Sequence, residues 1–444
     1  MRRIFLVTAN VALVAALVTS FTSCNGSSSS ETFRSPSEVR SSDGKLDVEL
    51  TVATQKNNIG GLEFVSSVYN GDYAAPALRV KPGDVINLRL RNLSQQQPTN
   101  IHYHGLEVSP QGNSDNIFVQ AEPDNCFDYQ IQIPSSEQGG MYWYHSHMMG
   151  LAETQVFNGL SGGLMIDQIQ QTLPFLAGMK ERIMILKDVQ VSDDGTVTTP
   201  DYSKPTLRTI NGVRQPSISI RPGETQLWRV GNVGANLFYY ITIEGHEMVE
   251  VARDGEVRNR PVRNTSLVVP PGARTEFLVT GGAPGTYKFK TLALDTGPDG
   301  DPTPEDVLGT LVVSGEAETP ITIPSTLVEQ KDFRTLPITN RRRIVFTENN
   351  DAGLFYINGQ LYSPSRDDVK VPLGAVEEWT LFNDTRELHT FHIHQGDFQL
   401  IEMDGVPQEF LGYQDTVDVP VGRTVKIIMP FINPLQVGRF VFHC

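Results

Sequence analysis

The sequence of 444 residues is long enough for about three domains, at roughly 150 residues each. Its hydrophobic content of 39% is ordinary for a protein with a buried core. The formal net charge of -15 argues against nucleic acid as a partner, because binding to phosphates requires clustered lysine and arginine side chains. With only three cysteines, the sequence also gives no sign of a disulfide framework.

The N-terminal stretch has the pattern of an export signal, which we place at residues 1–24. Arg2 and Arg3 precede a mostly apolar run that is short for a membrane span. The signal ends in Phe-Thr-Ser-Cys, which resembles a bacterial lipobox with Cys24 as the lipidated residue. The alternative is an ordinary cleavable signal with an incidental cysteine. The arginine pair and the residues after it also partly resemble a twin-arginine signal.

We therefore expect an exported bacterial protein, either in the periplasm or held at a membrane as a lipoprotein. A lipid on Cys24 is the only membrane contact that the sequence predicts. Residues 25–42 are polar and rich in serine, as a flexible tether would be.

After the tether, apolar and polar residues alternate in short runs bounded by Gly, Pro, Asn and Asp, which is typical of β-strands. Residues 85–90 and 286–289 are examples. No long run shows the apolar stripe of an amphipathic helix. The predicted fold class is therefore all-β.

An internal repeat divides the chain into three similar units. A turn containing proline and glycine opens an alternating strand three times, at residues 81–84, 221–224 and 371–374. We expect three β-sandwich domains in tandem, which cover residues 43–170, 175–315 and 325–444.

Eight of the nine histidines fall in four short clusters. In chain order these are His102 with His104, His145 with His147, the group His389, His392 and His394, and His443 beside Cys444. Because side chains alternate between the two faces of a β-strand, each His-x-His places both imidazoles on one face. Such clusters indicate bound metal.

The third cluster could serve two metal sites, one on each face of its strand. His392 and His394 share one face, whereas His389 points to the other. His443 and Cys444 are adjacent and also point to opposite faces. We expect His443 to join the first face and Cys444 the second. A cysteine with histidine is the start of a blue-copper electron-transfer site, and the all-histidine side suits copper or zinc.

Together, the four clusters resemble the four copper-binding motifs of the multicopper oxidases, the family of laccases, bilirubin oxidases and bacterial copper-tolerance oxidases. The match covers nearly the whole chain after the leader. It implies three cupredoxin-like Greek-key domains and four copper ions. The implied ligands are His102 and His392 for type 2 copper, His104, His145, His147, His394 and His443 for the type 3 pair, and His389 with Cys444 for type 1 copper.

The resemblance also implies an oxidase that couples one-electron oxidation of a reducing substrate to four-electron reduction of O2 to water. Electrons would pass from type 1 copper through Cys444 into His443, and so reach a trinuclear cluster between the first and third domains. Asp115 lies in a segment, residues 112–116, that resembles the family's acidic proton relay. Its alternative role is that of a turn residue in a polar loop.

The middle unit lacks the ligands. Aligned with the third unit, it has Phe238, Ile241 and Ile243 in place of the three histidines, and Lys290 in place of the histidine before the cysteine. Apolar side chains cannot bind metal, so this unit is predicted to be a copper-free spacer. The ninth histidine, His246, is expected to be a surface or structural residue.

Two other functions fit parts of the pattern. A lone His-x-His is more often a zinc or cupin-type site, so a zinc hydrolase is one alternative, although three such pairs with a His-Cys argue against it. A non-catalytic periplasmic copper-binding or scaffold protein on the same fold is the other. The reductant could be a phenol-like compound or a metal ion, and the lack of a long Met-rich insert favours an organic one.

The family's last motif continues past its cysteine with two more histidines and an axial residue, whereas this sequence stops at Cys444. We therefore expect the sequence to be an incomplete form of a longer protein. Cys126 has no partner left, and we expect it to be a small half-buried residue without a role.

Overall fold

The structure is a computed structural model that describes residues 31–197 and 206–444. The predicted export signal with Cys24 lies outside the described residues. Part of the predicted tether is folded, because β1 (Glu38–Arg40) pairs in parallel with β4 (Ala77–Val80), and Phe33 is buried in an apolar core. The expectation of a flexible segment up to residue 42 is wrong for this part. Within the described ranges, no helix has the length and apolar character needed to cross a membrane.

Two sheets form the first unit. One contains, in order, β1, β4, β9 (Ser161–Ile166), β8 (Gly140–His145) and β6 (His102–His104). The other contains β3 (Leu62–Tyr69), β2 (Lys45–Ile59), β5 (Val85–Asn92) and β7 (Cys126–Gln132). Two short helices, α1 (Ala152–Asn158) and α2 (Ile169–Thr172), flank β9 in the sequence.

The middle unit is also built from two sheets. The first contains β11 (Leu207–Ile210), β10 (Lys180–Val189), β13 (Thr225–Asn232), β18 (Arg274–Thr280), β15 (Met248–Arg253) and β16 (Glu256–Asn264). The second contains β12 (Ser217–Ile220), β20 (Asp306–Val313), β19 (Gly285–Leu292), β14 (Tyr239–Ile243) and β17 (Ser266–Val269).

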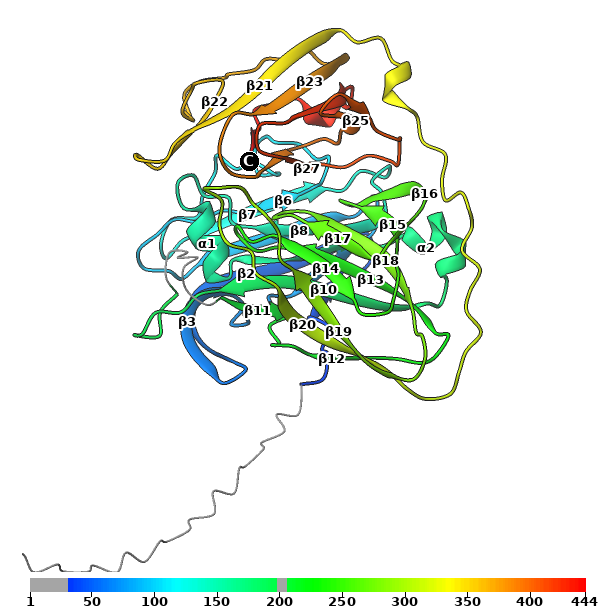
Figure 1. The fold of residues 1–444 in the computed structure, drawn as a ribbon. Coiled ribbons are helices and arrows are strands. Elements are labelled where there is room, and N and C mark those ends of the chain that lie inside the picture. The colour runs from blue at the N-terminus through cyan, green and yellow to red at the C-terminus, as the bar shows by residue number, and fades with distance from the viewer. Residues whose placement is uncertain (1–30, 198–205) are drawn as a thin grey trace, which may run out of the picture. The chain divides into compact units, whose positions relative to one another are not determined.

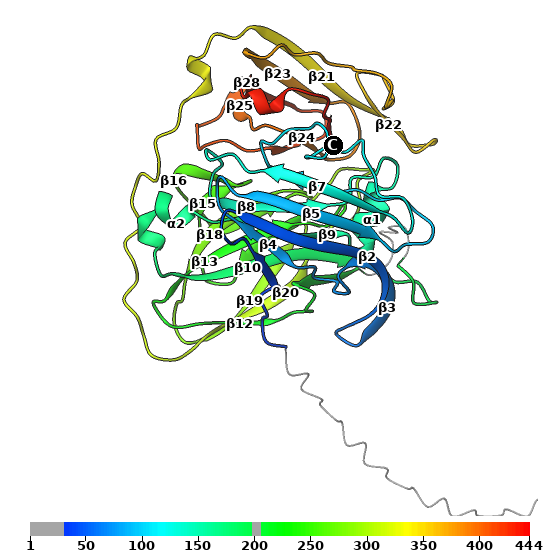
Figure 2. The same ribbon diagram turned by 180° about the vertical axis from the view of Figure 1, so that it is seen from behind.

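The third unit repeats this plan. Its larger sheet contains β22 (Leu354–Ile357), β21 (Asn340–Asn349), β23 (Ala375–Asn383), β28 (Thr424–Phe431), β25 (Gln399–Met403) and β26 (Val406–Pro407). Its smaller sheet contains β27 (Thr416–Val419), β24 (His389–Ile393) and β29 (Phe442–His443). Figures 1 and 2 show these strands, yellow to red, gathered in one region.

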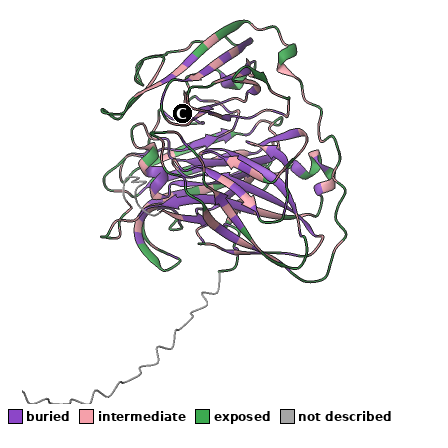
Figure 3. Ribbon diagram, viewed as in Figure 1, coloured by how far each residue is buried: buried purple, intermediate pink, exposed green. Residues whose placement is uncertain are grey.

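Apolar side chains on the inner faces of the sheets form a separate core in each unit. In β5, Ile86, Leu88 and Leu90 are buried, whereas Arg89 and Arg91, on the other face of the strand, are exposed. This alternation is the period of two expected for a strand with one face on a core. Figure 3 shows the buried positions concentrated along the strands. The prediction of an all-β fold is confirmed.

The internal repeat is visible in the strand pairing. In each unit the strand that follows the repeated turn pairs in parallel with an earlier strand: β5 with β2, β13 with β10, and β23 with β21. The turn glycines Gly83, Gly223 and Gly374 have φ angles of 89°, 75° and 93°. Glycine adopts such positive φ angles without the strain that a Cβ atom would cause.

A buried asparagine ends this strand in every unit. The side-chain amides of Asn92, Asn232 and Asn383 each donate two hydrogen bonds to backbone carbonyls, and each side-chain oxygen accepts one from a backbone N–H two residues later. All three side chains are fully buried. The loop after the strand is therefore fixed in the same way three times, and in the third unit this loop leads to His389. The exact domain boundaries stay predictions.

Candidate metal centre

Four strands from two units position the clustered histidines. In the first unit, β6 and β8 are antiparallel neighbours with His102 opposite His145. In the third unit, β24 and β29 are antiparallel neighbours with His392 opposite His443. The remaining members lie on these strands or directly after them: His104, His147 and His394. We call these seven residues the histidine cluster.

The two units interleave their imidazoles. The ring centres of His102 and His394 are 3.7 Å apart, those of His104 and His392 are 3.8 Å apart, and the Nε2 atoms of His147 and His443 are 3.3 Å apart. Each of these contacts joins one ring of the first unit to one of the third. Neither unit alone could therefore form the cluster.

Several sets of side chains in the cluster are close enough to share a metal ion. Among the described residues, ligand atoms lie within 4.8 Å of one another in four such sets: His102 with His392 and His394, His102 with His104 and His145, His147 with His394 and His443, and His104 with His392 and Asp415. Such sets can hold more than one ion, as the three coppers of a trinuclear centre require.

Ring nitrogens in this cluster lack hydrogen-bond partners among the described residues although they are buried. They are Nε2 of His102, His104, His145, His392 and His394, and Nδ1 of His147 and His394. Buried polar atoms are normally hydrogen-bonded, so a group of unpaired nitrogens facing one another indicates metal ligands. The residues present fit copper, for which imidazole is a suitable ligand.

Hydrogen bonds from Nδ1 fix the tautomers of His145 and His392. His145 Nδ1 donates to the Ser146 carbonyl at 2.8 Å, and His392 Nδ1 donates to the Asp415 carbonyl at 2.9 Å. A nitrogen that donates to a carbonyl carries the proton, which leaves Nε2 with a free lone pair. Burial lowers the pKa of His145 to about 3 and that of His443 to about 4. The rings are therefore neutral near pH 7, as a metal ligand must be.

Asp115 lies beside the cluster. Its side-chain oxygens are 3.0 Å from His102 Nδ1, and they accept hydrogen bonds from the Tyr103 N–H at 3.0 Å and from Gln395 Nε2 at 2.6 Å. Burial raises the pKa of Asp115 to about 7. The turn of this loop is stabilised instead by Asn116, whose side chain accepts from the Phe118 N–H. The Asp115 carboxylate thus contacts His102 and Gln395, and its role stays a prediction.

Asp415 was not anticipated from the sequence. Its carboxylate Oδ1 is 3.4 Å from His104 Nε2, and its backbone carbonyl holds His392. The middle unit supplies its counter-charge, because Arg274 of β18 pairs with it in the interior. Burial alone would raise the pKa of the Asp415 carboxyl, but the guanidinium of Arg274, together with the neighbouring His104, holds it well below its usual range.

Gly105, the residue after the first His-x-His, makes room for this pair. Its φ angle is 94°, and a Cβ atom there would lie 2.3 Å from Arg274 Nη2 and 2.9 Å from Asp415 Oδ2. Such distances are far below van der Waals contact. A glycine is therefore required at this place by both backbone conformation and space.

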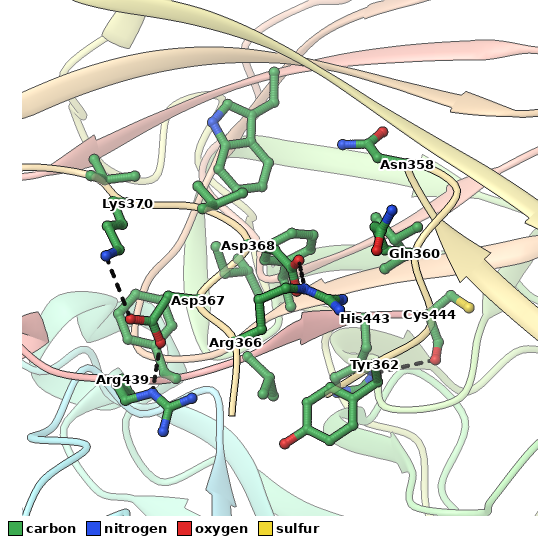
Figure 4. A pocket seen from close by; sticks show the side chains of 18 of the residues that line it. Asn358, Gln360, Tyr362, Arg366, Asp367, Asp368, Lys370, Arg439, His443 and Cys444 are labelled. Carbon is green, nitrogen blue, oxygen red and sulfur yellow. Dashed lines mark hydrogen bonds and ion pairs between the residues drawn. The ribbon is translucent and has the colours of Figure 1, made fainter. Parts of the chain in front are cut away.

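The predicted type 1 residues lie on the other side of β24. His389 and Cys444 both line a cavity of about 780 Å³, which Figure 4 shows with His443 and Cys444 side by side. Around the cavity, Arg439 pairs with Asp367 at 2.8 Å, and the exposed Tyr362 forms part of the wall. The cavity therefore gives the two predicted ligands a common space.

His389 also belongs to a set that the sequence analysis did not identify. Its ring nitrogen and carboxylate oxygens of Glu348 and Glu387 lie within 4.8 Å of one another. Glu387 is two residues before His389, and strand periodicity could have placed it on the same face. Glu348 is distant from His389 in the sequence, and no sequence pattern connects the two residues. Burial and then the neighbouring carboxylates raise the pKa of Glu387 to about 7.

The middle unit has apolar side chains where the third unit has histidines. Phe238, Ile241 and Ile243 are buried, the two isoleucines in its core. Lys290 forms ion pairs with Glu244 and Glu305. His246 Nδ1 donates to the Glu244 carbonyl, and its Nε2 accepts from the Gly282 N–H, as a structural histidine would.

Outside the histidine cluster, Cys126 is exposed at the start of β7, so the expectation that it is half-buried is wrong.

The chain is similar in sequence to known proteins. Models of the multicopper oxidase family match residues 52–171, 143–305 and 335–444. Multicopper oxidase mco of Staphylococcus haemolyticus is 23% identical over 389 residues, which cover 85% of this chain and 79% of that protein. Cell division protein FtsP of Gallibacterium anatis is 28% identical over 389 residues, which cover 82% of this chain and 79% of that protein.

The fold is shared with solved structures as well. A multicopper oxidase from Campylobacter jejuni, described as a metallo-oxidase, has a TM-score of 0.83 at 22% identity, with 94% of this chain and 92% of that chain covered. The cupredoxin-like fold and the copper cofactor expected from the sequence are thus confirmed. This chain belongs to the multicopper oxidase family and is a copper-dependent oxidoreductase.

Proposed function

We propose that this oxidase couples one-electron oxidation of a reducing substrate to four-electron reduction of O2 to water. The histidine cluster carries the proposal, because imidazoles of two units face one another with unpaired nitrogens. Copper bound there supplies the redox chemistry by cycling between Cu(I) and Cu(II). The chain holds the site together and keeps bulk water away, since most of these rings are buried.

The roles of the ligands follow the family pattern. His102 and His392 would hold type 2 copper, and His104, His145, His147, His394 and His443 the type 3 pair. His389 and Cys444 would hold type 1 copper. The peptide bond between His443 and Cys444 links the two sites covalently, so the chain itself provides the shortest bonded route between them.

Asp115 is the proposed proton donor. It is buried next to His102, and a pKa of about 7 allows it to hold a proton and to release it near neutral pH. Gln395 of the third unit fixes the second carboxylate oxygen at 2.6 Å. The carboxylate therefore keeps one position while its protonation state changes.

The partners of the reaction are O2 and a small reductant, either a phenol-like compound or a metal ion. The solved relative described as a metallo-oxidase supports the inclusion of metal ions.

We also propose export to the periplasm with a lipid on Cys24, supported by the lipobox-like end of the leader. Fractionation of cells that express Cys24→Ala tests this, since an anchored protein should move to the soluble periplasmic fraction.

Oxygen consumption by the complete, copper-loaded protein is the direct test. With a phenolic donor, we expect O2 uptake without accumulation of hydrogen peroxide. His394→Gln removes a ligand shared by two of the sets and should lower both bound copper and O2 uptake. His246→Gln is the matched control, because His246 lies in the middle unit away from the cluster. Equal losses in both variants would contradict the assignment.

A non-catalytic copper-binding or scaffold protein is the second candidate. The similarity to a relative named cell division protein FtsP favours it. It predicts a fully folded, copper-loaded protein that consumes no O2 with phenols, Fe²⁺ or Cu⁺. Turnover with any of these donors would exclude a purely structural role.

A further inference from the structure

A buried glutamine connects the two strands of the first unit that carry ligands. Gln155 lies in α1, the short helix between β8 and β9 (Figure 1), and is only 5% exposed. Glutamine is mostly found on protein surfaces, because a buried amide needs hydrogen-bond partners inside the protein. The partners of this amide therefore show what the side chain holds in place.

The side-chain oxygen of Gln155 accepts hydrogen bonds from two hydroxyl groups. One donor is the Oγ of Ser146, the residue between the two histidines of the second cluster, and the other is Thr99 Oγ1 at 2.9 Å. The side-chain nitrogen donates to the Pro98 carbonyl at 2.9 Å. Both ends of the amide are thus satisfied. We call Gln155, Ser146 and Thr99 the Gln155 network.

Ser146 connects this network to a metal ligand. Its hydroxyl donates to Gln155, and its backbone N–H donates to the Leu160 carbonyl at 3.1 Å. Its own carbonyl accepts from His145 Nδ1 at 2.8 Å. Because the first two contacts fix the orientation of Ser146, they also fix the acceptor that orients the His145 ring.

The other end of the network leads to further ligands. Asn100 directly follows Thr99, and its side-chain oxygen accepts the His147 backbone N–H at 2.8 Å. Two residues after Asn100, β6 begins with His102. Gln155 therefore ties the segment that leads into β6 to the segment that leaves β8.

We infer that Gln155 is a positioning residue for the predicted type 3 copper pair. It touches no ligand but acts through Ser146 and Thr99 on the spacing of the two ligand strands. Metal sites need their ligands within about 0.5 Å of the productive geometry, held by hydrogen bonds behind the ligands. The inference rests on the proposed function, because it concerns the copper pair at which O2 would be reduced.

Copper binding by the complete, copper-loaded protein tests this role. Gln155→Met keeps the length of the side chain and its helix propensity but removes the amide. The two Cu(II) ions of a type 3 pair are silent in EPR because their spins couple, so EPR-silent copper reports on this pair. We expect the chelator concentration that removes half of the EPR-silent copper to fall about 10- to 100-fold, the usual loss when a group behind a ligand is removed.

The matched control is Gln226→Met. Gln226 is equally buried, in β13 of the middle unit, where its amide donates to the Ser219 carbonyl at 3.0 Å and to Glu224 at 2.7 Å. The control should lose stability but keep wild-type affinity for EPR-silent copper. Equal losses of copper affinity in the two variants, or no loss in Gln155→Met, would overturn the inference.

A double-mutant cycle tests the route through Ser146. Ser146→Ala removes the hydroxyl and should also weaken binding of EPR-silent copper. If Gln155 acts through this hydroxyl, the double variant should lose less than the sum of the two single losses, because the residues share one contact. Fully additive losses, or no loss in Ser146→Ala, would contradict the route. Ser146→Ala also carries the test if Gln155→Met does not fold.

These measurements need no turnover, so they separate the inference from the proposed function. Unchanged affinity for EPR-silent copper in Gln155→Met, in an enzyme that consumes O2, would reject the role of Gln155 and keep the oxidase. A loss of affinity that depends on Gln155, in a protein that consumes no O2 with any donor, would reject the oxidase and keep the positioning role.

Discussion

Arg274 of the middle unit binds both carboxylate oxygens of Asp415 in the third unit, with Nη1 at 2.9 Å from Oδ1 and Nη2 at 2.7 Å from Oδ2. The remaining N–H groups of Arg274 donate to backbone carbonyls, among them that of Met141 in the first unit. One side chain of the middle unit thus connects all three units. It does so directly behind His104 and His392.

Substitution of Arg274 should alter the metal centre and not only stability. Arg274→Lys keeps the charge but loses the planar pair of donors, so Asp415 should shift against both imidazoles. We expect less bound copper, measured by atomic absorption, and changed hyperfine splitting of type 2 copper in EPR. Arg274→Met leaves a buried carboxylate unpaired and should lower the free energy of unfolding by about 3–5 kcal/mol.

The control for Arg274 is Arg229→Lys. Arg229 is equally buried in the middle unit, where it pairs with Glu181 and Glu276 away from the histidine cluster. It should lose stability but keep the EPR spectrum of the wild type. If the Arg274→Lys spectrum were also unchanged, the role of Arg274 would be structural only.

The Asp115→Asn substitution should slow proton delivery without slowing electron transfer. In the complete protein, reduction of type 1 copper by substrate should stay fast in stopped-flow absorption, whereas O2 turnover should fall by about 10²- to 10⁴-fold, the usual range for a general acid. Bound copper must be measured in parallel because Asp115 contacts His102. Full turnover with full copper would show that Asp115 has no role in proton delivery. The exposed Asp124→Asn is the control.

Asp188 gives a pH dependence that does not involve metal. It is buried in β10, both oxygens lack hydrogen-bond partners among the described residues, and burial raises its pKa to about 7. Between about pH 4 and pH 7 the native state holds a proton that the unfolded chain has lost, so this carboxyl lowers stability as pH rises through that window.

Asp188→Asn removes that titration. We expect the variant to be more stable than the wild type by about 2–4 kcal/mol at pH 8, with little difference at pH 4, in urea denaturation. Exposed Asp193→Asn should match the wild type at both values. A constant difference between Asp188→Asn and the wild type across this range would show that the carboxyl is ionised in the folded protein.

The Asn383→Ala substitution should destabilise the loop that leads to His389. Asn383 donates to the Glu387 and Val419 carbonyls, both at 2.8 Å, and the substitution removes both hydrogen bonds. We expect a loss of about 2–3 kcal/mol in the free energy of unfolding, at roughly 1 kcal/mol for each hydrogen bond. Asn232→Ala should cost about as much, because Asn232 makes the same two hydrogen bonds in the middle unit. No loss of stability in Asn383→Ala would show that the loop is held by other contacts.

Local patterns in the sequence predicted much of the fold. Strand alternation is a property of neighbouring residues, so the all-β class could be recognised from runs such as residues 85–90. The same period of two placed His392 and His394 on one face, and the structure brings both into the histidine cluster. The three-fold repeat was visible because each turn has the same local chemistry.

Contacts between units could not be predicted in this way. Arg274 and Asp415 are separated by 141 residues, and nothing local to either one indicates the other. Glu348 joins Glu387 only because β21 passes the loop before β24. That the middle unit is a copper-free spacer stays a prediction. Its contacts with the third unit, through Arg274 to Asp415 and through the Thr296 carbonyl to the Leu388 N–H, could not be read from the sequence.

A buried asparagine at the same place in each unit fixes the following loop by hydrogen bonds and not by a metal ion. Because hydrogen bonds from Asn92, Asn232 and Asn383 fix the loops, no unit depends on a bound ion to set its backbone there. A duplicated copy can therefore exchange histidines for Phe238, Ile241 and Ile243 and still fold. A unit without the ligands can thus keep its fold and serve another purpose, as the middle unit does when Arg274 holds Asp415 in place.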